Sequence, residues 1–302
     1  MEMPLSFWIG FNLVVVALLA LDLGVFHRKQ HAISIRESLV TTLGWIALAA
    51  GFGLWIIHQE GTTKGVEFFT GYLIEYALSM DNLFIFVLIF ASFQIAADQQ
   101  HRLLFWGVLG ALVMRGTLIL AGTALLHRFE WLIYLLGAYI LYSGLRMLLP
   151  EKSVEIKEMR VFSVLERVFP LTSADPAGRF IVREEGRLKF TLLFLVLMVI
   201  EITDLVFALD SIPAVFGVTT DPFIVYTSNV CAILGLRSLY FLLAGAIQRL
   251  TYLHVGLAFV LIFIGAKMVA AGFYSLPTEL SLFIVGGILA VAVAASLLKP
   301  KT

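Results

Sequence analysis

The stretch "EYALSMDNLFIF", residues 75–86, places the carboxylates of Glu75 and Asp81 and the amide of Asn82 inside an apolar segment long enough to cross a membrane. One acidic residue at the centre of a membrane-spanning helix costs about 3 kcal/mol on insertion scales. Such side chains need a partner within the protein: another polar group, a cation, a water-filled cavity or a buried basic residue. The stretch therefore predicts a polar site inside a membrane-embedded helix bundle.

The composition of the whole chain also indicates a membrane protein. Of its 302 residues, 60% are hydrophobic and 14% are charged, and the mean hydropathy is +0.97. Soluble domains contain roughly 45–50% apolar and about 25% charged residues. The N-terminal segment has no basic residues ahead of its apolar run, so we interpret it as a retained first span rather than a signal peptide. The single cysteine, Cys231, excludes a disulfide framework.

Nine apolar windows predict nine transmembrane helices, because about 20 apolar residues cross a hydrocarbon core about 30 Å thick. We therefore expect an all-α, polytopic membrane helix bundle that forms a single membrane domain over residues 1–302. The windows are residues 5–26, 39–58, 67–93, 103–126, 131–149, 190–216, 222–247, 251–273 and 279–298.

The distribution of basic residues predicts the orientation. With the N-terminus outside, sixteen of the 21 Lys and Arg residues fall on the inner side, and only Lys64 and Arg128 fall on the outer side. The positive-inside rule thus predicts N-out and C-in, with residues 150–189 as a cytoplasmic loop. Apolar residues at helical spacing predict a short helix in the first half of this loop. Its second half, "RFIVREEGRLKF", alternates around a Glu-Gly turn and predicts a β-hairpin.

Residues 67–149 and 190–273 carry their polar residues in the same order, which predicts an internal repeat. Each copy contains three predicted helices, and an odd number forces the two copies to run in opposite directions across the membrane. Inverted repeats are typical of secondary transporters, whose substrate sites form near the midplane where the copies meet. The matched pairs are Glu75–Asp204, Asp81–Asp210, Asn82–Ser211, Arg115–Arg237 and Gly144–Gly265.

Helical geometry limits how the polar residues of the first copy can converge. On a regular helix Glu75, Ser79 and Asn82 share one face, whereas Asp81 points about 120° away. We therefore expect either a break in the helix near residues 80–82 or ligands divided between two sub-sites.

Pro213 predicts an irregularity in the second copy, because it cannot donate a hydrogen bond to the carbonyl of Leu209. The freed oxygen would lie beside Asp210, as in the broken helices with which transporters coordinate cations. Carboxylate, amide and hydroxyl oxygens suit Mg²⁺, Ca²⁺ or Mn²⁺ rather than zinc or copper.

The candidate residues fall into three groups. A merely structural, hydrogen-bonded role is the alternative for each of them, and packing in a helix interface is the simpler interpretation of the softer ligand Met80. Arg115 and Arg237 are expected to be counter-ions that keep the acids charged or hold a closed state. The expected metal ligands are Glu75, Asp81, Asn82, Asp204, Asp210 and Ser211. Further candidates for the metal or proton path are Met80, Ser79, Glu201, Asn229 and Asp22.

Several of these stretches resemble the TerC family of integral membrane proteins. The motifs are "EYALSMDN", "EITDLVFALDSIPAVF", "TTDPFIV" and "SNVCAILGLRSLYFLL", and the likeness extends from the first motif to about residue 274. The resemblance implies a multi-pass protein of the bacterial cytoplasmic membrane, in a family whose better-understood members export Mn²⁺ with the motif acids as ligands. It points to the six expected metal ligands named above.

Three functions are compatible with the sequence. The first is a secondary transporter that exports divalent cations, above all Mn²⁺, by alternating access in exchange for protons. The second is a membrane scaffold in stress response or membrane-protein assembly. The third is an intramembrane aspartyl protease with Asp81 and Asp210 as its dyad, although the glycine-rich setting of such enzymes is missing. We expect the first, hence no enzymatic activity, no prosthetic group and no nucleic-acid partner; the sequence leaves the oligomeric state open.

Overall fold

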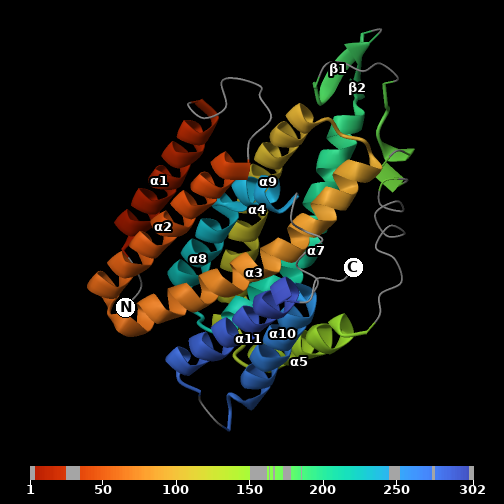
Figure 1. Cartoon of the computed structure of the whole chain (residues 1–302). Helices are drawn as coiled ribbons and strands as arrows, with labels where there is room; N and C mark the ends of the chain where they lie inside the picture. Colours follow the sequence, from red (N-terminus) through yellow and green to blue (C-terminus); the bar gives the residue numbers. More distant parts are fainter. Residues whose placement is uncertain are drawn as a thin grey trace.

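The computed structural model describes residues 4–24, 35–149, 162, 164–165, 167–172, 178–184, 186–244, 252–273 and 276–298. The described residues form a bundle of α-helices with one β-hairpin at one end (Figure 1). The helices are α1 (Leu5–Gly24), α2 (Ile35–Glu60), α3 (Thr62–Ser92), α4 (Ala97–Arg128), α5 (Leu132–Met147), α7 (Leu192–Phe216), α8 (Pro222–Leu234), α9 (Leu236–Ala244), α10 (Leu253–Ala270) and α11 (Thr278–Leu298), and the strands are β1 (Ile181–Glu184) and β2 (Arg187–Phe190).

Each of the nine predicted windows contains a helix or, for 222–247, the pair α8 and α9. Six helices, α2, α3, α4, α7, α10 and α11, are long and apolar enough to cross a membrane. The pair α8 and α9, bent by 42° at Gly235, would be a seventh span. The apolar helices α1 and α5 are shorter. The described helices therefore indicate a multi-pass membrane protein, and the number nine stays a prediction.

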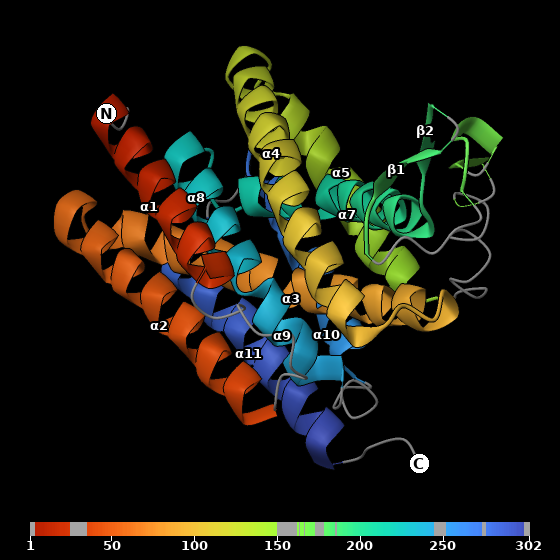
Figure 2. The same ribbon diagram turned by 90° about the horizontal axis from the view of Figure 1, so that it is seen from above.

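Helix α3 is the centre of the bundle. It contacts α2, α7, α8, α9, α10 and α11, and it runs across the other helices between the α1–α2 pair and the α5–α10 pair (Figures 1 and 2). It is one continuous helix from Thr62 to Ser92, so the predicted break near residues 80–82 is wrong. The physical reason is that residues 72–92 contain neither proline nor glycine, so every backbone amide there can continue the helix.

The predicted irregularity at Pro213 is also absent from α7, which continues to Phe216. Pro213 lies within the last turn, where one missing hydrogen bond ends a helix rather than splitting it. The bend occurs at Gly235 instead, between α8 and α9. The interruption therefore lies on the segment that carries Asn229 and Arg237, not on the segments that carry the paired acids.

Helices α5 and α10 lie side by side and approach closely through glycines (Figure 1). A Cβ added to Gly144 would lie 2.8 Å from the Ile262 nitrogen and 2.9 Å from the Ala258 oxygen. A Cβ added to Gly265 would lie 2.5 Å from the Leu141 nitrogen and 2.8 Å from the Gly137 oxygen. In both cases the obstacle is backbone of the facing helix, so a side chain at either position would push the helices apart.

The short strands β1 and β2 pair antiparallel where the sequence alternates, with Glu184 opposite Arg187. Gly186 takes a φ of +77°, a left-handed conformation that glycine adopts without strain. Arg102 of α4 donates a hydrogen bond of 2.6 Å to the Gly178 carbonyl, which ties the segment before the hairpin to the bundle. Of the helix predicted in the first half of the loop, residues 162, 164–165 and 167–168 are helical, and residues 154–161 lie outside the described part.

The close approach of α5 and α10 generates a stability prediction. Gly144→Ala and Gly265→Ala should each lower the free energy of unfolding by about 1–3 kcal/mol, because the new methyl group meets backbone that has no alternative rotamer. The measurement is the thermal unfolding midpoint of the purified protein in detergent. The control is Gly287→Ala on α11, where a Cβ meets nothing within 4 Å. Equal midpoints for all three variants would contradict the packing described above.

Candidate functional site

A fully buried arginine connects the two acidic stretches. Arg115 projects from α4, and only 1% of its surface is exposed. Its Nε and Nη2 donate to the two carboxylate oxygens of Asp204 on α7, at 3.1 and 2.9 Å. Its Nη1 donates to Glu75 on α3, and the same nitrogen lies 3.3 Å from the Ser211 hydroxyl. One guanidinium thus bridges carboxylates from α3 and α7, and its contact with Asp204 has the two-pronged geometry that makes Arg–carboxylate pairs strong.

The remaining contacts of Glu75 come from neutral groups. The Ser79 hydroxyl donates to Oε1 at 3.2 Å, and the Asn229 amide on α8 donates to Oε2 at 2.8 Å. Glu75, Ser79 and Asn229 are all 0% exposed. The carboxylate is therefore held by four helices: α3 itself, α4 through Arg115, α8 through Asn229, and α7 through the Asp204 that shares the arginine. We call Glu75, Arg115 and Asp204 the buried ion-pair cluster.

The buried ion-pair cluster carries an excess of negative charge. With both acids ionised, two carboxylates face one guanidinium, so the formal sum is −1. A buried charge without compensation costs several kcal/mol, whereas hydrogen bonds to a carboxylate partly offset that cost. The Oδ1 atom of Asn229 is also buried without a hydrogen-bond partner among the described residues. A cation bound there would compensate the excess negative charge and would accept a lone pair of the amide oxygen.

The other two motif acids lie outside the buried ion-pair cluster. The Asp81 Oδ2 atom is 3.5 Å from Nδ1 of His254 on α10, and 30% of the Asp81 side chain is exposed. The Ser143 hydroxyl on α5 donates to Asp210 at 3.0 Å, and the Tyr139 phenol also contacts that carboxylate. Asp81 and Asp210 therefore have different partners, on the two helices of the α5–α10 pair.

The remaining candidate residues, which include the expected ligand Asn82, have the following positions. Asn82 is 3% exposed, and its Nδ2 has no hydrogen-bond partner among the described residues. Met80 packs between two hydrophobic clusters, which agrees with the simpler interpretation of this residue. The Glu201 carboxylate lies against Gly110 of α4, in space that any larger residue there would fill. The side chain of Asp22 lies outside the described part of the chain.

Arg237, the predicted counterpart of Arg115, is also buried. It is 6% exposed and lies with Asp204 on the wall of a small cavity of about 20 Å³ between α3, α4, α7, α8 and α9. That volume is close to what one water molecule needs. The sequence pairing of the two arginines thus agrees with their burial, and the contacts given above assign the bridge between Glu75 and Asp204 to Arg115.

The described residues contain no group of three or more His, Cys, Asp or Glu side chains arranged to hold a metal ion. The predicted ligands are instead divided into the buried ion-pair cluster and the positions of Asp81 and Asp210. The expected ligands thus lie at different places, and that they form metal sub-sites stays a prediction. Sequence reasoning missed the partners Ser143 and His254, because neither has a polar counterpart in the other copy.

Comparison with known proteins gives consistent results. The model of the family described as "Integral membrane protein TerC family" matches residues 60–302. An uncharacterized membrane protein of Myxococcus xanthus is 46% identical over 295 residues, covering 97% of this chain and 92% of the relative. An Escherichia coli protein described as "Putative membrane-bound redox modulator Alx" is 42% identical over 292 residues, covering 93% of this chain and 91% of the relative. No solved structure gives a significant match.

The bridging role of Arg115 can be tested through stability. Arg115→Met should lower the free energy of unfolding by about 3–5 kcal/mol, because it leaves two buried carboxylates without their cation. The triple variant Arg115→Met, Glu75→Gln, Asp204→Asn should recover much of that loss, since it removes all three charges together. Thermal unfolding in detergent measures both effects, with the exposed Arg128→Met as the control. If the triple variant is no more stable than Arg115→Met, the ion pairs are not what the arginine contributes.

Proposed function

Because the chain belongs to the TerC family of integral membrane proteins, we propose that it is a secondary transporter that exports divalent metal cations, with Mn²⁺ as the favoured cargo. The observation that carries the proposal is the buried ion-pair cluster. There the Arg115 guanidinium occupies the position between Glu75 and Asp204 that a bound cation would take. Catalysis forms no part of the proposal.

In this arrangement the guanidinium of Arg115 takes the place of the transported cation. In the cargo-free protein its positive charge compensates the two carboxylates and offsets the repulsion between them. A divalent cation that enters from the cytoplasm would displace the guanidinium and gain the carboxylates, Ser79, Asn229 and Ser211 as oxygen ligands, a hard set suited to Mn²⁺. Return of the guanidinium would then expel the cation.

The contacts between α5 and α10 support inverted repeats as the moving parts. If Gly144 corresponds to Gly265, then residues 137 and 141 correspond to 258 and 262. The contacts of Gly144 with 258 and 262 and those of Gly265 with 137 and 141 are then the same contacts seen from opposite ends. Such reciprocity is expected from a two-fold axis between two antiparallel copies, 67–149 and 190–273. Transporters with inverted repeats alternate their access by rocking one copy against the other.

Export from an inside-negative cell requires a driving ion. Moving a divalent cation outward costs about 4.6 kcal/mol per 100 mV, twice the value for one charge. Exchange for two protons removes this cost because the net charge moved is zero. Glu201, half-buried beside Gly110 and one turn before Asp204, is placed to carry one of these protons. We propose an N-out, C-in orientation in the cytoplasmic membrane, so that the basic loop 150–189 faces the cytoplasm.

Other functions receive less support. A redox function based on a thiol pair does not fit this chain, because it has one cysteine. A protease dyad of Asp81 and Asp210 does not fit their contacts, since each acid has a different partner. A scaffold function is also compatible with the fold. A measurement of transport distinguishes it from the proposed function.

Transport by the purified protein in proteoliposomes tests the proposal. Wild-type protein should move Mn²⁺, and Glu75→Gln or Asp204→Asn should lower the initial rate at least tenfold, because an amide lacks the negative charge with which a carboxylate compensates a divalent cation. Glu60→Gln, at the exposed end of α2, is the matched control and should retain the wild-type rate. Asp81→Asn and Asp210→Asn report whether the second location belongs to the path. No Mn²⁺ flux by the wild-type protein would favour the scaffold, whereas wild-type rates in all four acid variants would reject these acids as ligands of the transported ion.

The coupling ion is tested separately with an imposed pH gradient. If two protons enter for each Mn²⁺ that leaves, acidifying the compartment that receives Mn²⁺ should accelerate transport, whereas an imposed membrane potential should have little effect. A rate that follows the potential and ignores the pH gradient would reject the exchange while leaving Mn²⁺ transport intact. Empty liposomes and the Glu75→Gln variant control for leakage.

A further inference from the structure

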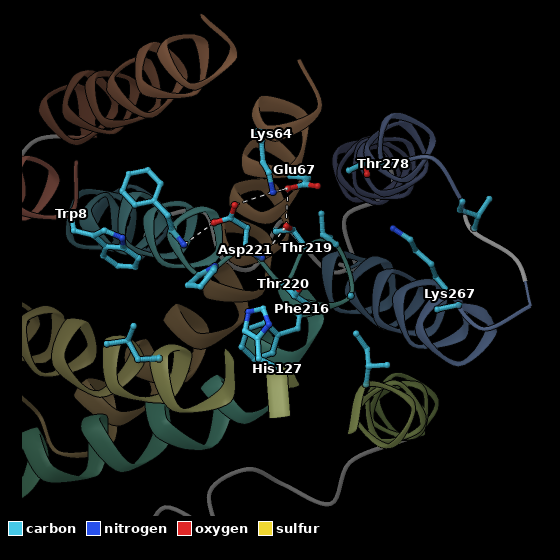
Figure 3. A pocket seen from close by; sticks show the side chains of 18 residues that line it. Trp8, Lys64, Glu67, His127, Phe216, Thr219, Thr220, Asp221, Lys267 and Thr278 are labelled. Carbon is cyan, nitrogen blue, oxygen red and sulfur yellow. Dashed lines mark hydrogen bonds and ion pairs between the residues drawn. The ribbon is translucent and has the colours of Figure 1, made fainter. Parts of the chain in front are cut away.

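A large cavity opens at the end of the bundle where α3, α8 and α11 begin and where α4, α7 and α10 end (Figure 3). Its volume is about 850 Å³, enough for a hydrated cation and many water molecules. In the proposed orientation this end faces the outside of the cell. Phe216 lines the cavity and also belongs to a buried hydrophobic cluster of the bundle. Glu67 lines the cavity on the same helix as Glu75, eight residues or about 12 Å earlier.

The two carboxylates of the cavity share one ammonium group. The Lys64 ammonium lies 3.1 Å from Glu67 and 2.9 Å from Asp221, so it bridges an acid of α3 and an acid at the start of α8. The Thr219 hydroxyl donates to Glu67 at 2.7 Å. The other oxygen of Asp221 accepts from the backbone nitrogens of Phe223 and Ile224, which caps α8. Both oxygens of Asp221 are therefore engaged, whereas the described contacts of Glu67 all fall on its Oε2 atom and leave Oε1 available to a cation.

Lys267 adds a second ammonium from the opposite wall. It projects from the last turn of α10, half-buried, and Figure 3 shows its ammonium directed into the cavity. Among the described residues it makes no hydrogen bond or ion pair, and Glu67 is the carboxylate whose charge attracts it across the cavity. Two lysines and two acids therefore give the cavity a formal charge of zero. Without Lys267 the formal charge would be −1.

We infer that Lys267 lowers the affinity of this cavity for divalent cations, so that a cation leaving the buried ion-pair cluster passes into bulk water rather than binding again to Glu67 and Asp221. A positive charge acts on a divalent ion with twice the energy that it exerts on a monovalent ion. A repulsion of about 1 kcal/mol, the size expected for charges a few ångströms apart in water, raises a dissociation constant roughly fivefold. The role in cation release rests on the proposed function. The effect of Lys267 on cation affinity can be tested without it.

The test is Mn²⁺ binding by the purified protein in detergent, followed by the loss of the electron paramagnetic resonance signal of free Mn²⁺. Lys267→Gln should shift the weakest phase of the binding curve to roughly fivefold lower Mn²⁺ concentration. Lys267→Arg keeps the charge and should match the wild type. The double variant Lys267→Gln, Glu67→Gln should lose the gain, because the cavity then returns to a formal charge of zero. Thermal unfolding checks that each variant is folded.

Each outcome decides the inference. A Lys267→Gln curve that coincides with the wild-type curve overturns it, and so does a gain that persists when Glu67 is replaced. Because binding is measured without a membrane gradient, the result is independent of transport. Absence of Mn²⁺ flux in proteoliposomes would reject the proposed function and leave this result standing. Mn²⁺ flux without the predicted shift in the binding curve would reject this inference and leave the proposed function standing.

Discussion

The structure depends on one buried arginine that satisfies two carboxylates from different helices. Acids at the centre of a membrane bundle are expensive alone, and five of them would cost on the order of 10 kcal/mol or more on insertion scales. Arg115 offsets that cost for Glu75 and Asp204 while it holds α3, α4 and α7 together. The same contacts would serve the proposed transport, because a cation that replaced the guanidinium would also change how α3, α4 and α7 are connected.

A second basic side chain bridges two acids near the surface. Lys64 bridges Glu67 of α3 and Asp221 of α8, as Arg115 bridges Glu75 and Asp204. Both bridges join a residue of the first predicted repeat to a residue of the second. A rocking motion of the two copies would have to exchange these contacts, whereas the glycine contacts of α5 with α10 are suited to remain as the axis. If the two copies move as proposed, the polar contacts, which water or cations can replace, would be exchanged, and the close backbone contact of α5 with α10 would be kept.

Much of this could be predicted from the sequence. Composition and hydropathy predict a multi-pass helix bundle, and every predicted window contains a helix; the family match confirms the resemblance carried by the acidic motifs. The common face of Glu75, Ser79 and Asn82 follows from helical periodicity, and all three are buried. Which acid meets which base does not follow, because partners such as Ser143, Asn229 and His254 lie far away in the chain. The wrong expectation of a helix break came from requiring Glu75 and Asp81 to converge, when each has a partner of its own.

The length of α3 has a mechanical consequence. Its 31 residues extend about 46 Å at 1.5 Å per residue, well beyond a hydrocarbon core about 30 Å thick. Such a helix lies steeply inclined or reaches into the headgroups on one side, and either solution depends on how thick the bilayer is. Because Glu67, Glu75 and Asp81 are spread along this one rod, a change in its inclination shifts all three relative to the membrane surfaces together. Lipid chain length would then determine how deep these three acids lie in the bilayer.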